Sequence, residues 1–477
     1  MDAKNIFQFI PEVKKPSEKK LDFNTKLKWT LVVLGVFFVL ANISLFGLSE
    51  NALERFEYLA IILGTDFGSI ISLGIGPIVM ASIILQLLSG SGILNIDTST
   101  TEGKRFFQGI QKLLVLFFII FEALVYVLLK GLQAEQGFAP LMIIQLILGG
   151  LAIFYMDEVT TKWGFGSGVS LFIGAGVSWR LFTSAFQFIT QQGQNCLLDF
   201  KGISCPGKML GMIQSFILGY KVEFYSAAVA ILATIIIFLM VVWVQSLKVE
   251  IPLSFGRIRG YGIKWPLAFF YASVIPVILT AALIANLQLF GGLLENAASV
   301  CLEGSCSGLA KFASYFGFLG HFIDGQAVSG LSFWVGSTNI LELLIRGGLL
   351  TRHWIQGLTH VLFFMIFSTV FSVFWVKTSG IDAKGQAHKI ATSGLQVAGF
   401  RQDERILESI LNRYIMPLTI MGGMAIGLLA SATNLLGALV SGTAILLVIM
   451  IMSQFYQSIA QQHSVDMNPA MRKFIGG

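Results

Sequence analysis

Charge is what this sequence has least of. Only 12% of its 477 residues are Asp, Glu, Lys or Arg, against about 25% in a soluble domain. Apolar residues make up 55%, with 41 Phe, and the mean hydropathy is +0.77. A chain with so few charges cannot cover a water-soluble surface of this size. The composition therefore predicts a polytopic membrane protein.

The sequence also lacks the motifs of an ATP-driven or catalytic protein. No Gly-x4-Gly-Lys-Ser/Thr occurs, which excludes a Walker-type nucleotide site and a motor in this chain. The GFGSG stretch at 164–168 does not follow the Gly-x-Ser-x-Gly pattern, and no His stands at a suitable partner spacing. We predict no catalytic residue, no cofactor, no metal and no enzymatic activity.

Long apolar runs are what the sequence has in abundance. A helix rises about 1.5 Å per residue, so crossing the hydrocarbon takes roughly 20 apolar residues. We expect an all-α protein with ten spans: Trp29–Phe46, Ile75–Ser89, Leu113–Leu129, Leu141–Met156, Val169–Ile189, Phe224–Val244, Leu267–Phe290, Trp354–Val376, Tyr414–Ala432 and Leu435–Phe455.

Positive charge gives the expected orientation. An even number of spans puts both termini on one side, and most of the 32 Lys and Arg residues fall on that side. By the positive-inside rule this side is cytoplasmic. Residues 1–28 hold seven lysines and no apolar run, so they are expected to be a polar arm and not a cleavable signal. We predict a multi-pass protein of the cell membrane with both termini in the cytoplasm.

The spans divide evenly. Five lie in an N-terminal half, 29–189, and five in a C-terminal half, 224–460. An outer loop, 190–223, separates the halves, and a cytoplasmic tail follows at 461–477. Because an odd-numbered half inverts its copy, this division suggests an inverted repeat around a central path. Two basic cytoplasmic loops, 248–266 and 377–413, belong to the second half.

All four cysteines fall in loops on the outer side, where disulfides persist. Cys196 and Cys205 share one loop, and Cys301 and Cys306 share another. We predict the bridges Cys196–Cys205 and Cys301–Cys306, with pairing between the loops as the alternative. No His or Cys cluster beside them favours a metal.

Charged residues inside the spans are few, namely Glu122 and Arg180. Glu122 could relay a proton or pack into the bundle. Aliphatic pairs four residues apart are more prominent, and Pro276 predicts a bend near Ile278. The aliphatic residues could face lipid, form a core, or line a pore that excludes water by dewetting. An ion-coupled transporter usually needs several polar groups at mid-membrane, so a secondary transporter for a small solute is kept as the alternative.

Several motifs resemble the SecY family, the large pore-forming subunit of the Sec translocon, in its archaeal and eukaryotic branch. They occur in family order: LGIGPIV (73–79), GSGVSLFIGAGVS (166–178), EIPLSFGRIRG (250–260), SVIPVILTAALIANLQL (273–289), KTSGIDAKG to GFR (377–401), and RYIMPLTI to NLLGAL (413–439). The resemblance implies a channel that translocates unfolded secretory polypeptides. It also implies that transmembrane segments leave the channel sideways into lipid.

The resemblance assigns roles to particular residues. The second span is too short to cross the membrane, and the charged segment before it, about 51–71, matches the family's re-entrant plug. In this plug, Leu59, Ile62 and Leu63 would pack inward. An amphipathic helix lying on lipid is the alternative for this segment. The apolar pore ring falls on Ile75, Val79, Val169, Ile173, Ile278 and Leu439. Met80 stands where archaeal relatives often have Thr, so no hydroxyl contact is expected there. Gln86 and Asn286 match the lateral gate between spans 2–3 and 7–8, and we expect a weak bond between their amides.

Partners also follow from the resemblance. Arg257, Arg259, Lys264 and Arg401 match positions that dock on the translating ribosome, and arginine is well suited to phosphate. Ordinary positive-inside patterning is the alternative for most of the lysines. Two small single-span subunits, like SecE/gamma and beta, are expected to complete the complex. The substrates would be nascent polypeptides with signal sequences, and membrane lipid would receive the released segments.

Overall fold

The structure is a computed structural model. It describes residues 12–17, 21–51, 67–94, 96, 100–129, 131–190, 194–198, 200, 202–255, 262–272, 274–299, 315–323, 326–392, 395–397 and 404–467.

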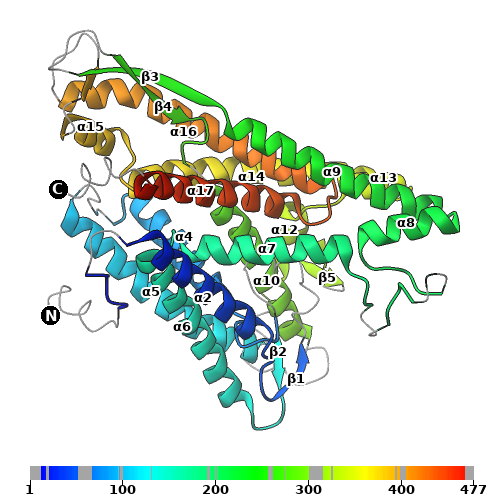
Figure 1. The fold of residues 1–477 in the computed structure, drawn as a ribbon. Coiled ribbons are helices and arrows are strands. Elements are labelled where there is room, and N and C mark those ends of the chain that lie inside the picture. The colour runs from blue at the N-terminus through cyan, green and yellow to red at the C-terminus, as the bar shows by residue number, and fades with distance from the viewer. Residues whose placement is uncertain are drawn as a thin grey trace.

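The chain is a helix bundle, which confirms the predicted all-helical membrane fold (Figure 1). In the described part, nine helices are long and apolar enough to span a membrane, and α4 is a shorter tenth. The ten are α2 Phe23–Ala41, α4 Gly76–Gly90, α5 Thr101–Leu128, α6 Ala139–Trp163, α7 Gly168–Phe186, α9 Lys221–Gln245, α10 Ile275–Ser299, α14 Thr351–Thr378, α16 Glu404–Leu435 and α17 Gly442–Met467. Shorter helices are α8 Lys208–Leu218, η4 Gly317–Leu319, α12 Leu331–Val335, α13 Ile340–Ile345 and α15 Ala383–Thr392.

Local sequence fixes several helix ends. The Thr100 hydroxyl caps α5 by accepting the Gly103 N–H at 3.0 Å. Ser167 stands at the N-cap of α7, where its side chain accepts from Ser170. Gly219 ends α8 in the left-handed conformation, with φ 79°, which glycine adopts without the cost of a Cβ.

Several helices extend beyond the predicted spans: α5 begins at Thr101 and not at Leu113, and α16 begins at Glu404 and not at Tyr414. Two other spans begin later than predicted. The seventh begins at Ile275, eight residues after the expected Leu267, which lies in a strand. Pro276 is the second residue of that helix, so the expected bend is wrong: proline suits a first turn because it needs no N–H partner there. The tenth span begins at Gly442, because α16 continues to Leu435 and a turn follows it.

Short strands lie at both ends of the bundle. β3 Lys248–Phe255 and β4 Gly262–Ala268 form an antiparallel hairpin, and β7 Leu395–Val397 adds to the β3 edge. This sheet and α15 lie at the end where α2 begins and α17 ends (Figure 1). At the opposite end, β1 Leu48–Asn51 pairs with β2 Leu132–Ala134, and β5 His321–Ile323 pairs with β6 Gln326–Ser329. The two basic loops therefore share one sheet.

Two hydrophobic cores hold these parts together. The main core joins residues of all ten long helices. Among the nine longest described spans, α10 is the most enclosed, because 78% of its most apolar 18-residue stretch is buried. A second core lies beneath the three-stranded sheet and joins Leu267 of β4, Ala387 of α15 and Leu411 of α16. Tyr271 fastens the same region by donating to the Ile381 carbonyl at 2.5 Å. Burial raises the pKa of Tyr271 to about 12.

The segment 12–17 is docked against the bundle. Lys112 contacts Glu12 and lies 2.6 Å from Glu158, and Lys162 lies within 3.5 Å of both carboxylates. The Val13 N–H also donates to Glu158 at 2.9 Å. The hydrogen bond from Lys112 lowers the pKa of Glu12 from its usual value. This four-charge cluster therefore ties the arm to α5 and α6.

Candidate channel and gate

Aliphatic residues from three helices belong to the main core. Val79 of α4, Ile173 of α7 and Ile278 of α10 belong to one buried cluster, with exposed fractions of 3%, 0% and 6%. Ile75, just before α4, is a member too, and Val169 packs against the cluster. Five of the six residues expected to form a ring therefore belong to the main core or pack against it.

The start of α4 is held by a close backbone approach. Val79 donates its N–H to the Ile75 carbonyl at 3.0 Å, so both residues lie on the same side of the first turn. The preceding segment crosses α6 at Gly149, where a Cβ would lie 1.9 Å from the Ile70 carbonyl oxygen. Only glycine leaves room for this crossing.

The start of α7 is fixed by α6. The Asp157 carboxylate accepts the Val169 N–H at 2.9 Å, and a Cβ at Gly168 would lie 2.6 Å from the Asp157 Cα. The two helices therefore meet through a short, tightly packed connection. This contact positions Val169 against the core.

The sixth expected residue, Leu439, lies in the turn between α16 and α17 and not on a helix. Its N–H donates to the Thr234 hydroxyl of α9 at 3.1 Å. Leu439 is partly exposed, while Val440 beside it is buried. The turn is thus anchored to α9.

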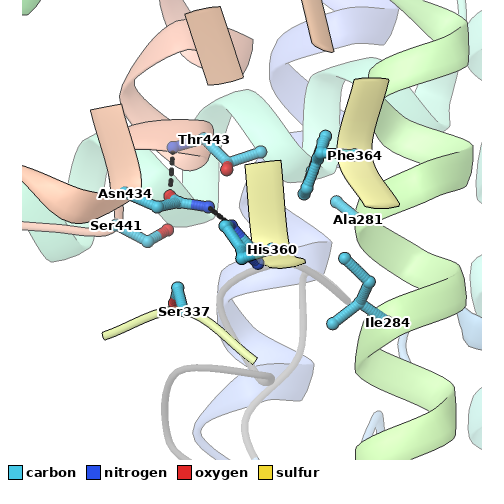
Figure 2. Close-up of a pocket in the computed structure, with 8 residues that line it drawn as sticks. All are labelled: Ala281, Ile284, Ser337, His360, Phe364, Asn434, Ser441 and Thr443. Atoms are coloured by element: carbon cyan, nitrogen blue, oxygen red, sulfur yellow. Dashed lines mark hydrogen bonds between the residues drawn. The ribbon is translucent and has the colours of Figure 1, made fainter. Parts of the chain in front are cut away.

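A buried polar network anchors the same turn from the other side (Figure 2). His360 Nδ1 lies 2.6 Å from the Val335 carbonyl and Nε2 lies 3.2 Å from Asn434 Nδ2, so Nδ1 carries the proton and Nε2 accepts. Asn434 Oδ1 accepts the Thr443 N–H at 2.8 Å. The network joins α14, α16 and α17 around a cavity of about 20 Å³.

A much larger cavity, of about 1010 Å³, opens beside Leu439. Residues from the 326–353 region line much of it, including Glu342, Arg346 and Arg352. Its wall is therefore partly charged, in contrast to the aliphatic cluster. No motif includes the polar residues of this region, so sequence reasoning assigns it no role.

The expected bond between Gln86 and Asn286 is not formed. Asn286 donates to the Ala282 carbonyl of its own helix at 2.8 Å, and the Gln86 Oε1 has no hydrogen-bond partner. Both side chains are buried, with 3% exposed. In a helix the carbonyl four residues earlier is always within reach, so it competes with a partner on another helix.

Apolar contacts cross the same boundary instead. The Phe121 ring of α5 lies 6.5 Å from the Phe290 ring of α10. At the end of α4, a Cβ on Gly90 would lie 2.4 Å from the Phe374 ring of α14. Aromatic packing on α10 and α14 therefore joins the α4–α5 pair at both ends of the boundary.

Glu122 lies close to the start of α4. It is 1% exposed, neither carboxyl oxygen has a hydrogen-bond partner, and a Cβ on Gly76 would lie 2.9 Å from Oε2. The Tyr126 hydroxyl, one turn along α5, has no hydrogen-bond partner either. Glu122 is thus packed into the bundle.

Other expected site residues differ in how far the structure describes them. Leu59, Ile62, Leu63, Arg257, Arg259, Arg401, Cys301 and Cys306 lie outside the described residues. The Lys264 backbone belongs to β4, where it pairs with Pro252. Cys196 and Cys205 form a disulfide, with their Cα atoms 5.3 Å apart. Nowhere in the described ranges do three His, Cys, Asp or Glu side chains gather as metal ligands would.

Comparison with known proteins decides the family. The family model described as SecY matches residues 69–456, which is most of the chain. The chain belongs to the SecY family. It is 39% identical to the protein translocase subunit SecY of Methanothermobacter thermautotrophicus, over 99% of this chain and 98% of the relative. It is 36% identical to the SecY of Methanocaldococcus jannaschii, over 98% of each chain.

Solved structures of SecY relatives have the same fold. A structure described as a protein conducting channel superposes with a TM-score of 0.80 at 35% identity, covering 98% of this chain and 99% of that one. Sec61 in the canine ribosome-channel complex from the endoplasmic reticulum gives a TM-score of 0.77 at 34% identity, with the same coverage. As a SecY-family chain, this protein forms a protein-conducting channel and is not an enzyme. The solute-transporter alternative is therefore set aside.

Proposed function

We propose that unfolded polypeptides pass through the ring formed by Ile75, Val79, Val169, Ile173, Ile278 and Leu439. The observation that carries this proposal is that Ile75, Val79, Ile173 and Ile278, from three separate parts of the chain, are buried in one hydrophobic cluster, against which Val169 packs. Such a cluster seals a resting pore because water is unfavourable in a narrow apolar constriction. The charged cavity beside Leu439 would receive the chain once it has passed the ring.

The lateral gate lies between the α4–α5 pair and the α10–α14 pair. Its resting contacts are the Phe121–Phe290 ring pair and Phe374 against Gly90, and the buried Gln86 and Asn286 lie along the same boundary. Contacts of this kind can be replaced by an incoming apolar signal helix. The segment 51–71, with Leu59, Ile62 and Leu63, would act as the plug. A SecY structure that covers 98% of this chain is described as having a plug domain that stabilises the closed state and maintains a membrane seal.

The end that carries the three-stranded sheet faces the cytoplasm, and Arg257, Arg259, Lys264 and Arg401 contact ribosomal RNA there. Relatives of this chain have been described in complexes with ribosomes, which supports this partner. Two small single-span subunits complete the channel, and the assembly lies in the cell membrane. The ribosome supplies the driving force, because the sequence contains no nucleotide site.

A crosslink tests the ring. A stalled nascent chain with one cysteine beyond its signal sequence is offered to a host chain bearing Val79→Cys, with its four native cysteines replaced. The control is Leu232→Cys, because Leu232 lies on an exposed face of α9. We expect a signal-dependent disulfide at position 79 and none at 232. Equal yields at both positions, with the ribosome bound, would refute the ring.

Charge reversal tests the docking loops. The double variant Arg257→Glu, Arg259→Glu should bind ribosomes more weakly and with a shallower dependence on salt. The reason is that binding through fewer phosphate contacts releases fewer counterions from the RNA. Arg346→Glu, at the opposite end of the bundle, is the matched control. If reversing Arg257 and Arg259 has no more effect than the control, these arginines do not contact RNA.

A further inference from the structure

The segment 190–223 contains a helix with an apolar exposed side. Helix α8 exposes Met209, Ile213, Phe216 and Ile217, with 39%, 50%, 74% and 63% of each residue accessible. Their spacing of four, three and one residues puts them on one face. Gln214 and Ser215 are buried on the other face. A loop that only faced water would not expose its largest apolar side chains.

The exposed face is held rigidly. Gln214 donates to the carbonyls of Phe200 and Ile203, at 2.7 and 2.6 Å, and accepts the Cys205 N–H at 2.8 Å. The Cys196–Cys205 disulfide closes the same loop. The Gly207 N–H donates to the Gln187 carbonyl just after α7. The position of α8 relative to α7 is therefore fixed by contacts on its buried side.

The exposed face continues onto a helix that spans the membrane. The Phe216 ring lies 5.7 Å from the Phe224 ring in the first turns of α9, and α8 lies beside the start of α9 (Figure 1). Further along, α9 exposes an apolar face at the helical spacing of seven, four, three and four residues: Tyr225, Leu232, Ile236, Leu239 and Trp243. Its apolar window is the most hydrophobic among the described spans, and only 28% of it is buried. That face meets lipid.

We propose that α8 and the first turn of α9 form a hairpin embedded at the boundary between headgroups and acyl chains, in the leaflet away from the three-stranded sheet. Lys208 and Lys221 flank the apolar face, and Tyr220 and Tyr225 are exposed beside it. Basic ends and tyrosines around an apolar helix face suit this depth of a bilayer. The occupant of the face is thus membrane lipid. The inference rests on the membrane fold and does not depend on the proposed pore ring.

Spin labels measure this depth directly. A nitroxide is attached at Phe216→Cys, in a chain carrying Cys301→Ser and Cys306→Ser, so that the native Cys196–Cys205 pair stays oxidised and unreactive. The chain is placed in lipid nanodiscs without other subunits. Collision rates are then measured with oxygen, which concentrates in lipid, and with a water-soluble nickel chelate. Leu232→Cys serves as the lipid reference and Arg346→Cys, in the large cavity, as the water reference.

We expect the oxygen-to-nickel ratio at position 216 to be several-fold above that at 346 and to approach that at 232. The same result at Ile217→Cys guards against a local distortion caused by one label. A ratio equal to that at position 346 would mean that the face lies in water. Low collision rates with both reagents would mean that protein covers it. Either result would overturn the proposal.

Discussion

The crossing of α6 by the segment before α4 gives a sharp test of the packing around the ring. In Gly149→Ala the new methyl group would lie 1.9 Å from the Ile70 carbonyl oxygen, far inside van der Waals contact, so backbone must move. Overpacking of this kind typically costs about 1–3 kcal/mol. The segment leads directly to Ile75, so its displacement should also disturb the seal.

Gly176→Ala is the matched control. Gly176 also lies inside a long helix, α7, but a Cβ there would meet nothing within 4 Å. Alanine favours a helix interior by about 1 kcal/mol over glycine, so this variant should be neutral or more stable. Thermal unfolding of the purified protein in detergent compares the two, and ion conductance in planar bilayers reports the seal. If both variants unfold at the same temperature and conduct equally little, the described crossing is wrong.

Three further changes test other contacts. Glu158→Gln should free the 12–17 arm and speed its amide hydrogen exchange, because the ion pair with Lys112 is lost. The pKa of Glu12 is lowered in the folded chain, so its contribution to stability is complete above the unfolded-state pKa and is lost as pH falls through the folded-state pKa. Acid should therefore loosen the wild-type arm too. Tyr271→Phe should cost about 0.5–1.5 kcal/mol of stability. Since its pKa is raised to about 12, wild type alone should lose this contribution between pH 10 and 12, which chemical unfolding across that range would measure. His360→Ala should lower the unfolding midpoint, because a buried Asn434 amide without its partner costs about 1–3 kcal/mol; an unchanged midpoint would contradict the described network.

Hydropathy was enough to predict the ten spans, but it placed the starts of the seventh and tenth too early and those of the third and ninth too late. Leu267 belongs to an apolar stretch that continues into Phe270, and hydropathy does not distinguish a strand on a hydrophobic core from a helix in lipid. The end of α16 and the start of α17 form one apolar run, and the turn between them rests on contacts with α9 and α14. Such contacts join residues far apart in the sequence.

The candidate site was predicted in part for a similar reason. Val79, Ile173 and Ile278 could be recognised because aliphatic residues sit within the family's motifs at helical spacing. The His360–Asn434 pair carries no local signal, since 74 residues separate its members. The amide of Asn286 was assigned the wrong partner, because a sequence does not tell whether a side chain bonds its own helix or a neighbour.

The pairing of β7 with β3 has a mechanical consequence for the proposed docking end. Two loops that are distant in the chain are joined in one sheet, where Leu253 pairs with Val397 and Phe255 pairs with Leu395, above a common hydrophobic core. A force applied to either loop is therefore transmitted to both through the sheet. The strand β4 leads into α10 through Tyr271, so the sheet is connected to the helix with the largest buried share among the described long spans.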